Sequence, residues 1–104
     1  VSAGPNSVAD TPDGSPAGYF LNQNYPNPFN PATMIEFSIA DPQFTTLKVY
    51  DMLGREVALL VNEELQAGKY TREFNAEALS SGVYFCRLQT GGTVRTIKML
   101  HAKK

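Results

Sequence analysis

The chain has 104 residues, about the size of one domain, and 42% of them are hydrophobic, with 6 Phe and 5 Tyr available for a core. The formal net charge is −1, so no overall field favours nucleic acid or a membrane surface as a partner. A single cysteine excludes an internal disulfide and a zinc site built from several cysteines. The longest apolar run, residues 57–61, is far too short to span a bilayer, which takes about 20 apolar residues.

Charge is divided unevenly along the chain. Residues 1–77 contain four Lys or Arg and ten Asp or Glu (−6), whereas residues 78–104 contain five basic residues and no acidic one (+5). A basic end of this kind is typical of an interaction tail. Ordinary surface charge with a solvated terminus is an equally open alternative.

Residues 1–18 are rich in Gly, Pro, Ser, Asp and Ala without apolar periodicity, which is typical of a linker or an extended segment. Asp10, Asp13 and Gly14 resemble part of a calcium-binding loop, but the rest of that pattern is absent, so turn residues are favoured. Because Val1 is not preceded by Met and no signal-peptide pattern follows it, we expect a mature product or a piece of a longer protein. The folded domain is predicted at residues 19–104.

A proline-rich crossing at residues 24–31 leads into this domain. Pro26, Pro28 and Pro31 fix φ near about −65° and remove three backbone donors, which excludes a helix and argues against a central strand. Phe29 is predicted to point inward as a plug, and the asparagines to hydrogen-bond to nearby backbone. Each proline also pushes the preceding residue toward an extended conformation; these residues are Tyr25, Asn27 and Asn30.

The remaining segments alternate between short β patterns and turns. Ile35, Phe37 and Ile39 share one predicted strand face, and Leu47 and Val49 share another. The spacing of these segments predicts an antiparallel β-sandwich of about seven strands. The predicted strands are residues 19–21, 33–39, 45–50, 56–61, 69–74, 82–88 and 94–100.

The connections between these strands carry their own predictions. Gly54, a residue that tolerates positive φ, is predicted to close a hairpin, and Gly91 with Gly92 a second one. Residues 62–67 are predicted as a polar loop and residues 75–80 as one helical turn. Because residues 82–88 are apolar on both faces, a central strand covered on each side is predicted there. Arg72 suggests either an edge position for residues 69–74 or a side chain whose apolar stem is buried while its charge reaches solvent.

Few side chains suit catalysis. His101 is the only histidine, and its place near the end of the chain argues against a nucleophile–histidine pair. Cys86 lies within an apolar run, where a buried, inert thiol is favoured over a reactive one. The acidic residues are typical of turns and surfaces, so no enzyme activity, cofactor or metal site is expected. Tyr50 and Phe85 are predicted to face outward, where they suit contact with a partner.

Several stretches taken together resemble one family. The residues that carry the resemblance most clearly are Tyr25, Pro26, Asn27, Pro28, Phe29, Asn30, Pro31, Tyr50, Asp51, Gly54, Arg55, Gly82 and Tyr84. With residues 65–68 and 98–100, they resemble the type A C-terminal sorting domains of proteins exported by the type IX secretion system. The Ig-like domain of flagellar hook-capping proteins is similar over the middle of the chain, so the resemblance indicates an Ig-like fold with Greek-key connections more firmly than the role.

The resemblance implies a secreted, non-catalytic module of the kind found at the end of Bacteroidota cargo proteins. It would pass through the periplasm to the cell surface or the extracellular space, and its partners would be the outer-membrane translocon and the cell-surface attachment machinery. The implied sorting signal is the last strand and basic tail, carried by Arg95, Lys98, Met99, Leu100, Lys103 and Lys104. His101 with Ala102, and Arg72, stand where apolar residues are usual in the family.

Strand addition gives this signal a physical basis. If residues 94–100 form an edge strand, its free backbone edge can pair with a strand of a receptor. Two alternatives remain open. One is a structural subunit of an extracellular assembly or filament, in which the N-terminal segment of one copy pairs with the edge of another copy. The other is a spacer or carbohydrate-binding module, which would require a row of exposed aromatic side chains.

Overall fold

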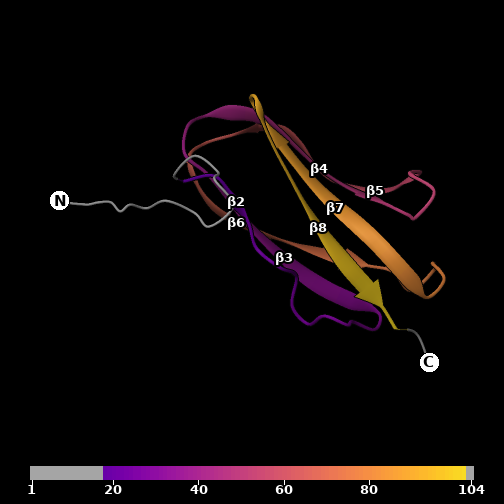
Figure 1. The fold of residues 1–104 in the computed structure, drawn as a ribbon. Helices are drawn as coiled ribbons and strands as arrows, with labels where there is room; N and C mark the ends of the chain where they lie inside the picture. The colour runs from indigo at the N-terminus through magenta and orange to yellow at the C-terminus, as the bar shows by residue number, and fades with distance from the viewer. Residues whose placement is uncertain (1–17, 103–104) are drawn as a thin grey trace.

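The structure, a computed structural model, describes residues 18–102, which form two antiparallel β-sheets packed face to face (Figure 1). One sheet has the order β2-β3-β6 and the other β5-β4-β7-β8. This confirms the predicted all-β sandwich of about seven strands. Within the described range no helix is long and apolar enough to cross a membrane. The strands are β2 (Phe20–Leu21), β3 (Ala32–Ile39), β4 (Gln43–Tyr50), β5 (Glu56–Leu65), β6 (Gly68–Asn75), β7 (Gly82–Thr90) and β8 (Thr93–His101).

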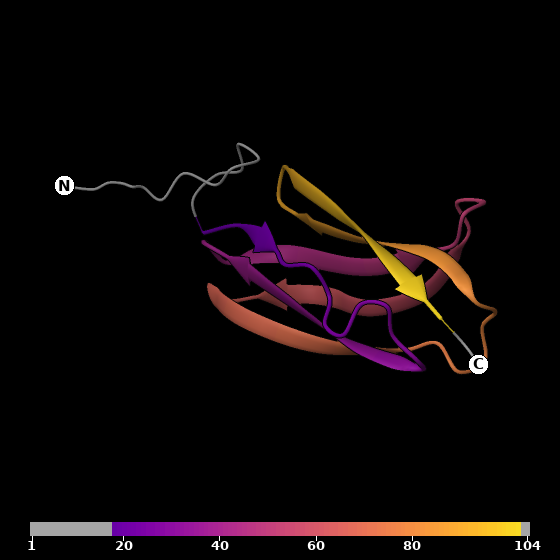
Figure 2. The same ribbon diagram turned by 60° about the horizontal axis from the view of Figure 1, so that its bottom comes forward.

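The chain changes sheet repeatedly, as a Greek-key sandwich requires. Hairpins join β4 to β5 and β7 to β8, whereas β3 pairs with β6 and β4 pairs with β7, which are distant in sequence. Figure 2 shows the two layers nearly edge-on, with the end of β8 and the β4–β5 hairpin at the same end of the sandwich. Residues 1–17 lie outside the described residues, so the predicted boundary at residue 18, the calcium-loop alternative and the strand-donating segment stay predictions.

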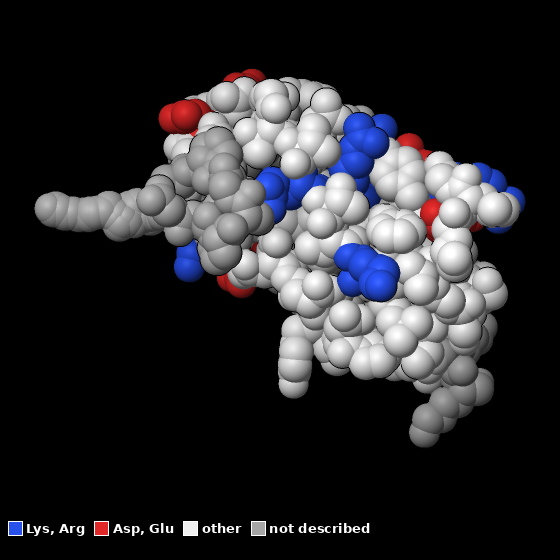
Figure 3. All heavy atoms as spheres, in the orientation of Figure 1, with Lys and Arg blue, Asp and Glu red and all other residues white. Residues whose placement is uncertain are grey.

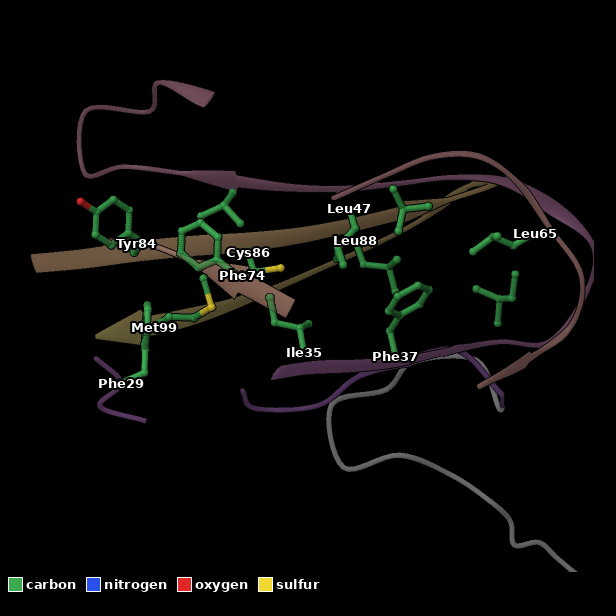
Figure 4. Close-up of a cluster of buried hydrophobic side chains, with 14 residues drawn as sticks. Phe29, Ile35, Phe37, Leu47, Leu65, Phe74, Tyr84, Cys86, Leu88 and Met99 are labelled. Carbon is green, nitrogen blue, oxygen red and sulfur yellow. The ribbon is translucent and has the colours of Figure 1, made fainter. Parts of the chain in front are cut away.

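The core lies between the inward faces of the two sheets (Figure 4). The predicted inward residues of β3 and β4 are confirmed, because each is at most 2% exposed. Since side chains alternate along a strand, this period of two was readable from the sequence. The buried hydrophobic residues are Phe29, Ile35, Phe37, Ile39, Leu47, Val49, Val61, Leu65, Phe74, Ala76, Tyr84, Cys86, Leu88 and Met99.

The polar loop predicted at residues 62–67 is wrong, because β5 continues to Leu65. Its outer part pairs with β4 from Gln43 to Leu47, and Leu65 is buried at its end. As β5 is an edge strand, Glu63 and Glu64 remain exposed while their backbone is paired. The pairing with β4 also contains two register shifts, which interrupt the regular edge.

Two further predictions differ from the structure. Residues 75–80 form no helical turn; a single reverse turn is closed there by Leu79 N–H donating to Ala76 O. β7 is central in its sheet as predicted, but only one of its faces is covered, and Arg87 on the other face is exposed. Phe85 and its cross-strand neighbour Tyr50 lie half-buried on this outer face, as predicted.

The predicted edge position of Arg72 is confirmed, because β6 is the outer strand of its sheet. The guanidinium carbon lies 5.8 Å from the centroid of the Tyr70 ring, and the side chain donates to Thr71 O. The stem of Arg72 therefore lies along the sheet while its charge stays near the surface.

Candidate recognition surface at the last strand

β8 is an edge strand with strict alternation between its two faces. Its even-numbered side chains, Val94, Thr96, Lys98 and Leu100, are exposed on the outer face, whereas the odd-numbered ones point toward the other sheet and become more buried toward the end of the strand. β8 is edge-placed because it pairs only with β7 within the four-stranded sheet. The last strand therefore presents one exposed row, with both polar and apolar side chains, to a partner.

Because side chains alternate between the two faces of β8, the residues of the predicted sorting signal lie on different faces of the strand. Lys98 and Leu100 lie together on the outer face, and Leu100 is 42% exposed. Met99 is fully buried, so its side chain belongs to the core, and Arg95 lies half-buried on the inner side of the strand. Lys103 and Lys104 lie outside the described residues. A single partner surface can therefore contact Lys98 and Leu100 together but not Met99.

Basic side chains gather over β7 and β8 on the face shown in Figure 3. Cross-strand pairing brings Lys48 beside Arg87, and Arg87 beside Thr96. The guanidinium carbon of Arg87 lies 5.9 Å from the centroid of the Tyr50 ring, which holds this charge against the sheet. Neither β7 nor β8 contains an acidic residue, so the surface of these two strands is positively charged.

The proline-rich crossing lies against the end of this strand. Phe29 N–H donates to Leu100 O at 3.0 Å, and Ala102 N–H donates to Phe29 O at 2.9 Å. The side chain of Asn27 accepts Leu100 N–H at 3.0 Å, and the side chain of Gln23 donates to Lys98 O at 2.7 Å. Residues 23–29 thus form an edge cap over the C-terminal half of β8.

Phe29 fixes the edge cap to the core, as the plug interpretation predicted. Its ring is 2% exposed, meets the Phe74 ring edge-on at 5.8 Å and stacks on the His101 ring at 5.2 Å. Asn24, also buried, donates to Pro26 O at 3.1 Å and to the Thr33 hydroxyl at 3.0 Å. The prediction that the asparagines bond to nearby backbone is therefore confirmed for Asn24 alone, because Asn27 bonds to Leu100, which is distant in sequence, and the Asn30 side chain has no hydrogen bond to a described residue.

His101 is part of β8 and is 1% exposed, so the view of it as a trailing residue beyond the last strand is wrong. Its Nδ1 lies 3.2 Å from Ser80 O, which also accepts the Tyr84 hydroxyl at 2.7 Å. Nε2 has no partner. The ring stacks on Phe29 in the core, at the position where the resemblance predicted an apolar side chain.

The hairpin between β4 and β5 is held by Asp51. Its carboxylate accepts the backbone N–H of Arg55 at 3.0 Å and of Leu53 at 2.9 Å, and pairs with the Arg55 guanidinium at 2.8 Å. The Arg55 N–H, with the Arg55 guanidinium and the Leu53 N–H, holds the pKa of Asp51 below its ordinary value. Gly54 closes the turn with φ of 83°, as predicted.

A hollow of about 500 Å³ lies between this hairpin and residues 78–83. Gly82, with φ of 147°, directs the chain along its wall into β7. The acidic side chains that line it are paired, Asp51 with Arg55 and Glu56 with Lys48 at 3.5 Å. The hollow is therefore lined by two stretches that carry the family resemblance, the β4–β5 hairpin and the start of β7, and its carboxylates are engaged in ion pairs.

The Cys86 thiol and a possible metal site are the two remaining candidates for reactive chemistry. Burial raises the pKa of the Cys86 thiol to about 12, which disfavours the nucleophilic thiolate. Among residues 18–102, no group of three or more His, Cys, Asp or Glu could hold a metal ion. The surface on β8 is thus the arrangement in this part of the chain that best suits recognition.

The fold and this surface define an Ig-like β-sandwich that presents its last strand at a sheet edge. The family model for the secretion system C-terminal sorting domain matches residues 23–102, so the chain belongs to this family, the sorting domains of the type IX pathway. Membership implies a protein exported to the cell surface or the extracellular space. Comparison with curated proteins gives no match.

Proposed function

We propose that this domain is a non-catalytic module that directs a cargo protein through the outer membrane by the type IX pathway, and that the translocon recognises β8 and the basic tail. The observation that supports this most is the exposed outer row of β8, in which Lys98 and Leu100 lie on one face opposite Phe85 and Val83 of β7, with Arg87 beside Thr96 further along the same face. Residues 1–18 would link the cargo to the domain at residues 19–104.

The buried residues of β8 have a different part in this proposal. Met99 is fully buried and His101 is 1% exposed, so they hold the strand on the core. Lys98 and Leu100, with Lys103 and Lys104, make the contacts to the translocon and afterwards to the cell-surface attachment machinery. Deleting the whole strand would remove both kinds of residue, so a test of recognition needs substitutions of exposed side chains.

The test is a secretion assay in a host that has this pathway, with a folded reporter joined to the full chain. A triple variant, Lys98→Ala with Lys103→Ala and Lys104→Ala, removes the three lysines of the proposed signal. Surface display is expected to fall about tenfold, the effect of losing three surface charge pairs of about 0.5 kcal/mol each. The matched control is Lys69→Ala, an exposed lysine on β6 in the other sheet.

The control should be displayed like the parent, and the triple variant should accumulate in the periplasm with a folded reporter. If the parent fusion stays in the periplasm, the sorting function is wrong for this chain. If the triple variant is displayed at the parent level, sorting stands but recognition through these three lysines is wrong.

A further inference from the structure

The free edge of β8 consists of two parts, and the chain itself closes one of them. The edge cap binds Lys98 O, both backbone groups of Leu100 and Ala102 N–H. Backbone groups alternate in direction along an antiparallel edge strand, so Val94 and Thr96 direct their N–H and C=O groups to the same open side. No described residue hydrogen-bonds to these groups of Val94 and Thr96, or to Lys98 N–H.

We propose that this open edge, formed by Val94, Thr96 and Lys98 N–H, is the docking site for an extended acidic segment of the export machinery. The inference rests on the proposed sorting function and adds the place and the chemistry of recognition. A segment laid beside Val94–Lys98 can bond to the N–H and C=O of Val94 and Thr96 and to the N–H of Lys98.

The charge around the open edge favours an acidic occupant. Lys98 projects from the edge strand on the outer face, Arg87 lies beside Thr96 on β7, and Arg95 lies on the inner side of β8. With no acidic residue in β7 or β8, a neighbouring strand would meet positive charge on both of its faces. Glutamate or aspartate side chains on the added segment would complement these charges.

The same charges disfavour a second copy of this chain as the occupant. Antiparallel pairing of two β8 strands would bring Lys98 and Arg95 of one copy close to the basic side chains of the other. Like charges on neighbouring strands destabilise the pair, and a lysine on an edge strand is a common means of preventing such self-association. The edge is therefore suited to a partner of opposite charge.

The edge cap determines where pairing with a partner ends. A segment extending beyond Lys98 would have to displace Asn27 and Phe29 from Leu100. Because the Phe29 ring is 2% exposed and packed on Phe74 and His101, its displacement would open the core. We therefore expect the added segment to pair with Val94, Thr96 and Lys98 and to stop before Leu100.

Binding can be measured without the translocon by NMR on the ¹⁵N-labelled full chain. The probe is a synthetic peptide of alternating Glu and Val, and the control is the same peptide with Lys in place of Glu. The acidic peptide should shift the amide signals of Val94, Thr96 and Lys98 and leave those of Leu100 and Ala102 in place. The inference is wrong if these edge amides do not respond, or if they respond equally to both peptides.

Thr96→Pro removes the outward N–H and leaves the ladder to β7 intact, because proline is tolerated where an edge N–H faces solvent. Thr96→Ala is the matched control, since it keeps that N–H. Thr96→Pro should weaken peptide binding about tenfold, the effect of one lost hydrogen bond together with the added ring. Urea unfolding of both variants shows whether the fold is kept.

Lys98→Glu tests the charge separately, without a backbone change. It should weaken binding of the acidic peptide about fivefold or more. In the secretion assay, Thr96→Ala should be displayed and Thr96→Pro should not.

Display of folded Thr96→Pro at the parent level overturns the edge site while the sorting function stands. A parent that is never displayed overturns the sorting function, and the edge site is then decided by the NMR titration. Edge amides that shift with protein concentration, together with a dimer in sedimentation equilibrium, would assign the edge to a second copy and overturn the proposal.

Discussion

Phe29→Ala is the substitution that most directly tests how the edge cap is anchored. The ring is 2% exposed and lies 5.8 Å from the Phe74 ring and 5.2 Å from the His101 ring. Truncation to alanine removes all of these contacts and leaves a cavity, whereas the two backbone hydrogen bonds of Phe29, to Leu100 and Ala102, do not depend on the side chain. Buried Phe→Ala substitutions cost about 3–5 kcal/mol.

That cost is a large part of the stability of a domain this size, which is typically about 5–15 kcal/mol. The melting temperature should fall by roughly 12 °C or more, at about 4 °C or more for each kcal/mol. Urea unfolding followed by circular dichroism gives the free energy of unfolding by linear extrapolation. Tyr25→Ala is the matched control, because Tyr25 lies in the same segment but is 80% exposed, and it should change stability by about 0.5 kcal/mol or less.

A loss of less than about 1 kcal/mol in Phe29→Ala would refute this reasoning, since a ring packed in the core cannot be removed at so small a cost. An equal loss in Tyr25→Ala would also refute it. The effect would then belong to the segment as a whole rather than to the buried ring.

Three further outcomes follow from the same contacts. Cys86, whose pKa burial raises to about 12, should react with a thiol reagent at pH 8 at least about a hundredfold more slowly in the folded chain than in urea; equal rates would show that the thiol is accessible. Asn24→Ala removes two donated hydrogen bonds from a buried site and should cost about 1–3 kcal/mol in urea unfolding, whereas exposed Asn30→Ala should be nearly neutral; equal losses would contradict the special role of Asn24. Because the folded pKa of Asp51 is lowered, the stability that its charge contributes is present above the unfolded pKa of about 3.9 and is lost as pH falls through the folded pKa. The difference in urea midpoint between the parent and Asp51→Asn should therefore be present at pH 7 and disappear on acidification; a difference that does not depend on pH would contradict this.

Local patterns in the sequence were sufficient to predict most of the fold. The inward residues of β3 and β4 follow from a period of two, and Gly54 and the Gly91–Gly92 pair mark their hairpins through local turn chemistry. The plug role of Phe29 was predictable because prolines on both sides leave an extended segment with one large apolar side chain. These features depend on residues that are close together in the chain.

The errors arose where pairing with a distant strand outweighed local polarity. Asn62, Glu63 and Glu64 have the composition of a loop, but their backbone pairs with β4, so the strand continues through them. His101 was predicted as a trailing residue because of its polarity and its position. It is buried because Phe29 and Tyr84, from other parts of the chain, pack around it.

The sequence by itself determined that the chain is an antiparallel sandwich with a basic last strand, because alternation, turn residues and charge are properties of neighbouring residues. Only the tertiary structure decided which part of that strand is open to a partner. The contacts that close the rest join residues far apart in the chain, Asn27 to Leu100 across 73 positions and Gln23 to Lys98 across 75. No local pattern encodes such a contact, since it exists only when the two sheets bring the proline-rich crossing alongside β8.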